Sequence, residues 1–181
     1  MKRKIVITGG TGFIGMALAE YLSKLDFQVI LISRNIPLKS LPYKHCKWDG
    51  SSLGEWTKRL QGAFAIVNLA GRSVNCIKSP DNCDEILRSR VESTLILSQA
   101  IEQLDTPPKV WIQMSTAHIY GDPPSSICDE HSALGYGLAP DIGRAWENAF
   151  YAAPLAGVRK VAFRTSFVMG KTGGALQTMK R

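Results

Sequence analysis

No apolar run in this sequence of 181 residues approaches the roughly 18 residues that a membrane-spanning helix needs. The first residues are apolar, but they lead into a glycine turn and not into a signal-peptide cleavage site. The sequence also has no internal repeat and no low-complexity tract. We therefore expect one globular domain that is cytoplasmic and does not attach to a membrane.

Cysteine pairs and blocks of basic residues are missing as well. The four cysteines, Cys46, Cys76, Cys83 and Cys128, form no C-x-x-C pair and have no metal-ligand spacing with the three histidines. This predicts reduced thiols and no bound metal. The net charge is +7, but Lys and Arg are scattered, which argues against nucleic-acid binding. The positive charge either attracts a polyanionic cofactor or phosphorylated substrate, or is that of a soluble basic surface.

The first fifteen residues hold the most informative pattern. Residues 4–8 form a short apolar run rich in β-branched side chains, and a glycine turn and a helical apolar pattern follow at once. The glycines stand at Gly9, Gly12 and Gly15. In a strand–turn–helix context, such a loop is typical of dinucleotide binding. The glycine spacing alone leaves a second interpretation open, a tight turn with no ligand.

Each glycine has its own expected role. A side chain at Gly9 would hinder the tight turn, and one at Gly12 would hold the backbone away from a pyrophosphate. A side chain at Gly15 would separate the helix from the strand. The N–H groups at the start of the helix, together with the helix dipole, would then attract an anion.

Strand and helix patterns alternate along the rest of the chain. We expect strands at 4–8, 28–33, 44–49, 64–69, 110–115 and 160–165, and helices at 13–25, 53–60, 81–104 and 140–153. Pro37 and Pro42 mark one loop, and residues 121–135 form another. This alternation predicts an α/β fold with a parallel sheet, right-handed crossovers and a ligand cleft beyond the carboxyl ends of the strands.

The two longer helices near the end of the chain have predicted buried faces. In the helix at 81–104 this face holds Ile86, Val91, Leu95, Ala100, Ile101 and Leu104. In the helix at 140–153 it holds Ile142, Trp146, Ala149 and Phe150. Both sets follow the spacing of an amphipathic helix that packs on a sheet.

The end of the second strand predicts which cofactor is bound. NAD-selective sites usually place Asp or Glu here, but this chain has Ser33, Arg34 and Asn35. Arg34 offers planar donors to a 2′-phosphate, so we expect NADP in preference to NAD, unless Arg34 is simply a solvated loop residue. Asp49 would accept a hydrogen bond from the adenine amino group. The small residues Ala70 and Gly71 would let the cofactor lie over the end of their strand.

Several motifs resemble those of one protein family. They are TGGTGFIG at 8–15, NLAG at 68–71, STAHIYG at 115–121 and RTSFVMG at 164–170. Together they resemble the extended short-chain dehydrogenases/reductases of the NAD-dependent epimerase/dehydratase group. SRVEST at 89–94, WE at 146–147 and GKTGGAL at 170–176 are similar to a subfamily of uncharacterised "epimerase family" proteins.

The resemblance implies a Rossmann-type doubly wound parallel sheet with strand order 3-2-1-4-5-6. It also implies bound NADP(H) and a homodimer formed through the two long helices. Residues 1–181 would form one NAD(P)-binding domain. Such proteins usually continue for about another hundred residues, so we expect the substrate-binding region to be absent here. The residues expected to bind the cofactor are Gly9, Thr11, Gly12, Phe13, Ile14, Gly15, Ser33, Arg34, Asp49, Leu69, Ala70, Gly71 and Ser115.

For catalysis, the resemblance implies a Ser or Thr that orients the substrate oxygen, a Tyr that acts as acid and base, and a Lys four residues after it. The Lys is needed because an unperturbed phenol titrates near pH 10. Thr116 takes the Ser/Thr position, or else it is only a strand-end cap. The Tyr-x-x-x-Lys pair is absent, because Tyr120 is followed four residues on by Pro124, and Tyr136 by Pro140.

Other residues are available to replace the missing pair. Tyr120 or Tyr136 could supply the phenol with Arg144 as the cation, and His118 could act as acid or base. Packing or solvated loop positions would explain these residues equally well. Arg90 is expected to be structural or to contact a phosphate.

Two functions follow from these observations. The first is an NADP-dependent oxidoreductase, or a nucleoside-sugar epimerase-like enzyme, acting on a small polar carbonyl or sugar-type substrate. The second is an NADP(H)-binding redox sensor or regulatory protein without catalysis. Whether the chain is an enzyme stays open at this point, because the Tyr-x-x-x-Lys pair is missing.

Overall fold

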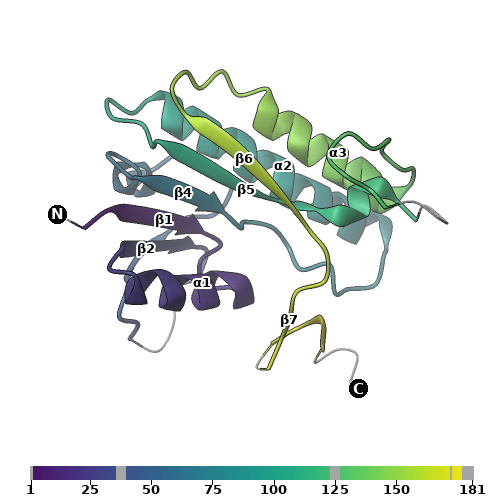
Figure 1. The fold of residues 1–181 in the computed structure, drawn as a ribbon, viewed down its shortest axis with the longest axis horizontal. Coiled ribbons are helices and arrows are strands. Elements are labelled where there is room, and N and C mark those ends of the chain that lie inside the picture. Colours follow the sequence, from purple (N-terminus) through teal and green to yellow (C-terminus); the bar gives the residue numbers. More distant parts are fainter. Residues whose placement is uncertain (1, 36–39, 123–126, 172, 177–181) are drawn as a thin grey trace.

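The protein forms a six-stranded parallel sheet with helices on both faces (Figure 1). The structure is a computed structural model that describes residues 2–35, 40–122, 127–171 and 173–176. The strand order is β3-β2-β1-β4-β5-β6, which confirms the predicted Rossmann-type topology. The strands are β1 (Lys4–Thr8), β2 (Gln28–Ser33), β3 (Lys44–Lys47), β4 (Ala65–Asn68), β5 (Val110–Thr116) and β6 (Arg159–Thr165).

The helices also fall where the periodicity predicts them. They are α1 (Phe13–Lys24), α2 (Pro80–Glu102) and α3 (Leu138–Tyr151), with short 3₁₀ helices η1 (Glu55–Arg59) and η2 (Ala117–Tyr120). Residues 53–60 were expected to form a helix, and η1 occupies the middle of that stretch. None of the helices in the described ranges combines the length and the apolar character needed to cross a bilayer.

The sheet separates two apolar layers. On the face covered by α2 and α3, buried residues include Val6, Ile66, Leu97, Trp111 and Phe150. On the face covered by α1, the buried residues include Ile5, Ile7, Ala19, Leu31 and Val67. β1, β2 and β4 are buried on both faces because each contributes apolar side chains to both layers, as expected for central parallel strands.

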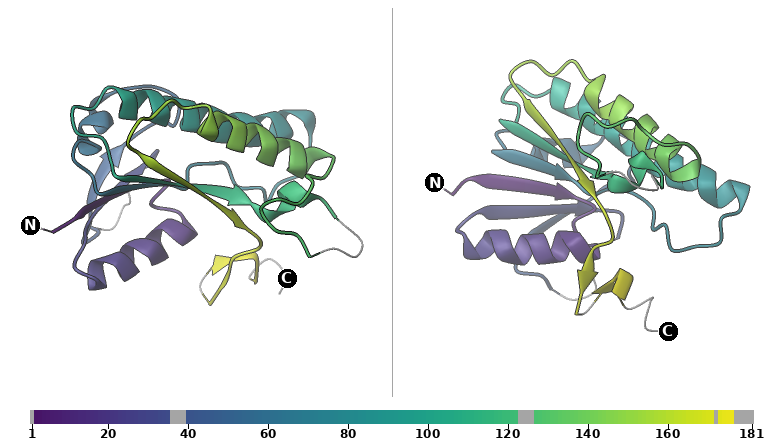
Figure 2. Two further views of the ribbon diagram at one scale, coloured as in Figure 1. Left: turned by 45° about the horizontal axis from the view of Figure 1, so that its top comes forward. Right: turned by 45° about the vertical axis from the view of Figure 1, so that its right-hand side comes forward.

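The sheet is covered unevenly. α1 packs on β1 and β2, and Figure 2 shows that this helix does not extend beneath β5 and β6. Along β5 the burial alternates at every residue, so that Trp111 is buried while Ile112 and Met114 are only partly buried. β6 has no fully buried residue. Within the described ranges, these two strands therefore lack a helix on one face.

Helix α2 differs from its predicted amphipathic pattern. Leu95 was expected to be buried but is 43% exposed, and Val91 is partly exposed. The polar residues Ser93 and Thr94 are fully buried in their place. Apolar spacing could not reveal this arrangement, because Thr94 is buried through hydrogen bonds to residues on distant elements.

The ends of other elements are also informative. α3 begins at Leu138, two residues before the predicted start, and Pro140 lies in its first turn, where no intrahelical N–H bond is lost. All four residues predicted on its buried face are buried. Beyond β6, the chain forms a small antiparallel hairpin of β7 (Met169–Gly170) and β8 (Gly173–Gly174). Pro37, one of the two loop prolines, lies outside the described residues.

Candidate functional site

A groove of about 570 Å³ opens at the carboxyl ends of the strands. It lies between the turns that follow β1, β2 and β4 and the first half of α2. Nine of the residues predicted to bind the cofactor line it: Gly9, Thr11, Gly12, Ser33, Arg34, Asp49, Leu69, Ala70 and Gly71. The structure thus brings together residues that are up to 62 positions apart in the chain, as the parallel topology requires.

The glycine turn has the geometry of an anion-binding loop. Gly9 has φ +66°, and a Cβ there would lie 2.6 Å from the Leu69 carbonyl oxygen. A Cβ on Gly15 would lie 2.5 Å from the carbonyl oxygen of Gly10, so glycine keeps helix α1 close to the turn. Gly12 differs, because the nearest atom to its Cβ would be the Gly9 oxygen at 3.3 Å. A side chain at Gly12 would therefore meet little of the protein but would take up space in the groove that a ligand could fill.

The start of helix α1 has donors without side-chain acceptors. Its N-cap is Gly12, and no side chain of the described residues caps the helix. The first N–H groups of a helix have no intrahelical partner, so at this end they are available to an anionic ligand. Phe13 and Ile14 therefore can contribute backbone N–H groups, although neither residue lines the groove.

The Phe13 side chain has a separate structural role. Its ring packs against Gly170, Gly173 and Gly174 of the β7–β8 hairpin, and a Cβ on Gly173 would lie 2.5 Å from the ring. The hairpin glycines therefore accept the ring because they have no side chains. This contact joins the start of α1 to the chain that follows β6.

The end of β2 leaves one arginine facing the groove without an ion pair. The Ser33 hydroxyl donates to the Asn35 carbonyl at 2.9 Å and lies 2.8 Å from the His45 ring nitrogen. Burial lowers the pKa of His45, which favours its neutral form. Arg34 lines the groove and is exposed, and it forms no ion pair within the described ranges.

Asp49 is also at the groove, but its carboxylate already binds its own loop. It accepts hydrogen bonds from the backbone N–H groups of Ser51 and Ser52, both at 2.9 Å, and from the Ser52 hydroxyl. The Ser52 hydroxyl and these backbone groups lower the pKa of Asp49. The carboxylate shapes the loop that follows β3, and its expected contact with adenine stays a prediction.

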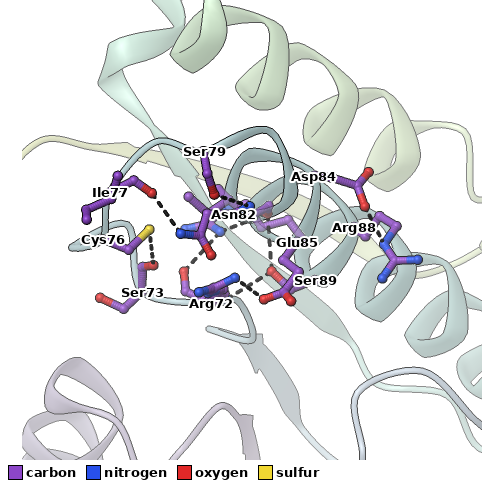
Figure 3. A network of polar contacts seen from close by, with 12 residues as sticks. Arg72, Ser73, Cys76, Ile77, Ser79, Asn82, Asp84, Glu85, Arg88 and Ser89 are labelled. Atoms are coloured by element: carbon purple, nitrogen blue, oxygen red, sulfur yellow. Dashed lines mark hydrogen bonds and ion pairs between the residues drawn. The ribbon is translucent and has the colours of Figure 1, made fainter.

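The opposite wall of the groove is held by polar contacts of α2 (Figure 3). The backbone N–H of Arg72 donates to the Ser89 hydroxyl at 2.9 Å, and the Arg72 guanidinium pairs with Glu85. Arg88 pairs with Asp84 at 3.1 Å. Both of these groove arginines are therefore engaged by carboxylates of α2, in contrast to Arg34.

A buried network fixes the turn after β4. The Thr8 hydroxyl donates to Asn68 Oδ1 at 2.6 Å, and the Asn68 amide donates to Gln113 Oε1 at 3.0 Å. Asn68 Oδ1 also accepts from the N–H of Ala70 at 3.1 Å, which holds the groove-lining turn. Trp146 donates from its ring to Thr94 at 3.1 Å and links α3 to α2. Several secondary-structure elements thus support one wall of the groove.

Arg90 is structural in this arrangement. Its guanidinium donates to the carbonyl oxygens of Arg72 and Ile86 and lies over the Trp146 ring at 5.1 Å. Burial lowers the pKa of Arg90. Arg90 does not line the groove, so its position fits the expected structural role and not the expected phosphate contact.

The residues predicted for catalysis lie at the end of β5, outside the groove lining. The Thr116 hydroxyl accepts from the backbone N–H of His118 at 3.2 Å, which caps η2. The His118 ring meets Phe167 edge to face, with centroids 5.0 Å apart. The Tyr120 hydroxyl accepts from Arg164 at 2.7 Å.

A buried ion pair next to these residues was missed by the sequence analysis. Arg164 binds Glu147 with two hydrogen bonds of 2.9 and 2.7 Å, and Ser115 donates to the same carboxylate at 2.5 Å. Glu147 is 6% exposed. Ser115 therefore points into this pair and does not reach the groove. Both charged residues stand in motifs named above, RTSFVMG and WE, but no short-range pattern pairs them.

The geometry of this ion pair shifts the pKa values of both of its groups. Burial by itself raises the pKa of the Glu147 carboxyl, but the hydrogen bonds from Arg164 and Ser115 and the charge of Arg164 bring that pKa below its ordinary value. The hydrogen bonds to Glu147 raise the pKa of Arg164, so both groups are charged. Arg164, and not the proposed Arg144, is the cation beside Tyr120. Arg144 instead donates to the Gly135 carbonyl and to Asp141.

The helix that faces Thr116 presents a glycine. A Cβ on Gly143 would lie 3.1 Å from the Thr116 methyl group and 3.1 Å from Ile119. A side chain at position 143 would therefore require the Thr116 methyl group or Ile119 to shift by a few tenths of an ångström.

The family model for the NAD dependent epimerase/dehydratase family matches residues 5–140. The chain belongs to this family. The match includes the glycine turn, the end of β2, the turn after β4 and the end of β5, which are the segments that build the groove and the Thr116 region. A nicotinamide dinucleotide is therefore the cofactor class that membership of this family supports.

Individual relatives support the same assignment. An epimerase family protein of Staphylococcus haemolyticus is 29% identical, with 98% of this chain and 59% of that protein covered. The structure is similar to human epimerase family protein SDR39U1 with NADPH, at 31% identity and TM-score 0.84, covering 98% of this chain and 58% of that one. It is also similar to a nucleoside-diphosphate sugar epimerase from Corynebacterium glutamicum, at 30% identity and TM-score 0.82, covering 99% and 37%. The chain spans less than two thirds of the length of each relative.

Proposed function

We propose that this chain binds NADP(H) in the groove and takes part in an epimerase-like or oxidoreductase reaction on a small polar carbonyl or sugar-type substrate. The observation that carries the proposal is Arg34, a groove arginine without an ion pair among the described residues, beside a glycine turn. The similar human protein was crystallised with NADPH, which supports the same choice of cofactor.

The proposed binding mode uses the groove from one end to the other. The pyrophosphate would lie on the N–H groups at the start of α1, where Gly12 has no side chain to hold it away. The 2′-phosphate would lie against Arg34, whose planar guanidinium can donate two parallel hydrogen bonds. Leu69, Ala70 and Gly71 would contact the middle of the cofactor.

Calorimetric titration with NADPH and NADH tests the proposal. Arg34→Ala should lose about 1.5–3 kcal/mol of binding free energy for NADPH, the value of a hydrogen bond to a charged group, and little for NADH. Arg59→Ala removes the same charge from an exposed position outside the groove and should leave both affinities unchanged. An equal loss for both cofactors in Arg34→Ala would contradict the assignment.

For the chemistry, we propose Thr116 as the group that orients the substrate oxygen and Tyr120 or His118 as the acid and base. Tyr120 already has a cationic neighbour, because Arg164 donates to its hydroxyl. The Arg164 guanidinium would stabilise negative charge that develops on the Tyr120 hydroxyl oxygen during the reaction. Turnover measured on a panel of carbonyl compounds and nucleotide sugars should fall in Thr116→Ala and in Tyr120→Phe.

A second candidate function, NADP(H) binding without catalysis, is favoured by the missing Tyr-x-x-x-Lys pair. The Thr116 hydroxyl also has a structural role already, because it accepts the hydrogen bond that caps η2. A sensor or regulatory protein would bind NADPH with unchanged affinity in Thr116→Ala and would turn over no compound of the panel. Turnover by the wild type that disappears in Thr116→Ala would exclude it.

We also propose that residues 1–181 act as one dinucleotide-binding domain and associate as a homodimer through α2 and α3. Leu95 of α2 and Tyr151 of α3 are exposed at 43% and 56%, and apolar side chains at such positions are suited to a helix–helix interface. Sedimentation equilibrium should give a dimer for the wild type and a monomer for Leu95→Glu. Leu25→Glu, just after α1 and at 51% exposure, is the matched control.

A further inference from the structure

A short chain of hydrogen bonds lies at the end of β2, next to Arg34. The Ser33 hydroxyl donates to the Asn35 carbonyl oxygen at 2.9 Å, and the same hydroxyl oxygen lies 2.8 Å from Nε2 of His45. Ser33 lines the groove and is buried, whereas His45 belongs to β3, is partly buried and does not line the groove. His45 therefore contacts a groove residue through the Ser33 hydroxyl.

The two contacts of Ser33 determine the direction of both hydrogen bonds. A hydroxyl has one proton, and a carbonyl oxygen can only accept, so the Ser33 proton is used at Asn35. The contact with His45 is then a hydrogen bond only if the ring donates from Nε2. Burial lowers the pKa of His45 and favours the neutral ring, which carries a single N–H group. That N–H group therefore belongs on Nε2, and Nδ1 is unprotonated.

The hydrogen bonds of the sheet hold β2 as far as Ser33. The Ser33 carbonyl oxygen accepts from the backbone N–H of Trp48 at 3.0 Å, and the pairing of Ser33 with Lys47 is the last in the register of β2 and β3. Within the described ranges, the hydrogen bond that holds the next two residues, Arg34 and Asn35, is the one from the Ser33 hydroxyl. The Ser33 side chain thus fixes the turn on which Arg34 stands.

A donor aimed at the Ser33 oxygen also changes what the hydroxyl can offer to a ligand. Hydrogen bonds in a chain polarise one another, so a hydroxyl that accepts from a ring N–H is a stronger donor. The oxygens of a phosphate dianion only accept, and they form stronger hydrogen bonds than a neutral ribose hydroxyl does. A hydroxyl that is held as a donor therefore favours a phosphate over a ribose hydroxyl at the same place.

We propose that His45 is a positioning residue for the 2′-phosphate of NADP(H): by donating from Nε2 to the Ser33 hydroxyl, it holds that hydroxyl as a donor and keeps the turn that carries Arg34 in place. This inference rests on the proposed binding of NADP(H) in the groove. It adds a residue of β3, outside the groove lining, to those that determine the choice of cofactor.

Calorimetric titration of His45 variants with NADPH and NADH tests the proposal. His45→Phe keeps a ring but has no N–H group, and it should weaken NADPH binding by about 3- to 10-fold, the effect of one hydrogen bond. NADH has no 2′-phosphate, so its affinity should change by less than about 2-fold. His45→Gln places an amide N–H near the position of Nε2 and should keep the wild-type preference. His131→Ala, at an exposed position outside the groove lining, is the matched control and should change neither affinity.

A double-mutant cycle tests whether His45 acts through Ser33. In the Ser33→Ala protein, the further change His45→Phe should alter NADPH affinity by less than about 2-fold, because the group through which His45 acts is already gone. Additive losses in the double variant would overturn the proposal. Equal losses for NADPH and NADH in His45→Phe would also overturn it, and so would a loss in His45→Gln as large as that in His45→Phe.

A measurement without cofactor separates this inference from the proposed function. Nitrogen-15 NMR of the histidine rings, with the His45 signals assigned from their absence in His45→Gln, should show the proton on Nε2, and a proton on Nδ1 would overturn the proposal. A wild type that prefers NADPH through Arg34, together with an unchanged His45→Phe, would overturn this inference and leave the proposed function intact. A wild type that binds no NADPH would overturn both.

Discussion

In the part of the chain that the structure describes, the half of the sheet made by β1, β2 and β4 is buried on both faces, whereas β5 and β6 are covered on one. In the first half, apolar side chains alternate between two layers and every strand is nearly continuous in apolar residues. In the second half, the covered face holds the apolar Trp111 together with the hydrogen-bonded polar side chains of Gln113, Ser115 and Arg164. The groove is therefore supported by apolar packing and by the hydrogen bonds of Asn68, whereas the region of Thr116 depends on the ion pair of Glu147 and Arg164.

The two halves also divide the expected functions. The groove lies at the ends of β1, β2 and β4, and the residues proposed for catalysis lie at the end of β5. Binding can thus depend on a rigid, doubly covered layer, while the catalytic region depends on contacts that reach it from α3 and β6. The effects of substitutions on the unfolding free energy should therefore differ between the two halves in size and in pH dependence.

Core truncation should separate the two halves most strongly. Leu31→Ala, in the doubly covered half, should cost about 4 kcal/mol of unfolding free energy, because the side chain is fully buried and a cavity would remain. Phe163→Ala, in the open half, should cost less than about 1.5 kcal/mol, because half of its surface is already in water. Urea denaturation followed by circular dichroism measures both values. Equal costs would show that the face of β5 and β6 on the side of α1 is covered in solution.

Removal of the buried charge tests the polar network. Glu147→Gln should lower the unfolding free energy at neutral pH by about 3 kcal/mol, because Arg164 loses its charged partner. This is the low end for a buried pair, since 22% of the Arg164 side chain is exposed. Urea denaturation at neutral pH measures the loss.

The same pair predicts a pH dependence. The pKa of Glu147 is lower in the folded protein than in the unfolded chain, so its contribution is complete above the unfolded value of about 4.3. The contribution is lost as the pH falls through the folded pKa. Between about pH 7 and pH 3, the unfolding free energy should fall more steeply with decreasing pH in the wild type than in Glu147→Gln. Equal pH dependence of the unfolding free energy in the two proteins would show that the Glu147 carboxylate is not paired in solution.

Two glycines of the same turn give the smallest effects and separate folding from binding. Gly9→Ala should cost about 1–3 kcal/mol of stability, because the residue has positive φ and its Cβ would meet the Leu69 carbonyl. Gly12→Ala should cost less stability, at most about 1 kcal/mol, because its Cβ would meet only the Gly9 carbonyl oxygen at 3.3 Å, but it should weaken NADPH binding. Thermal unfolding and calorimetric titration on the same samples check both. Full NADPH affinity in Gly12→Ala would mean that the pyrophosphate lies elsewhere.

Most of the fold was predictable because the signals are local. The β-branched runs of β1 and β2 and the apolar spacing of α3 define these elements within a few residues. The position of Arg34 and the glycine turn at one edge of the sheet was also predictable, because each follows a strand and parallel strands end at the same edge. The Leu95 prediction was wrong because a buried Thr or Ser is invisible to hydrophobic periodicity unless its distant hydrogen-bond partners are known.

The sequence by itself determined the order of the strands and helices, the family and the groove-lining turns, since these depend on patterns within short segments. Only the tertiary structure decided which faces are covered and where the buried charges pair. Arg164 and Glu147 are 17 residues apart, and Asn68 and Gln113 are 45 apart. No local pattern encodes such partners, because burial of a polar group is favourable only when a distant group reaches it.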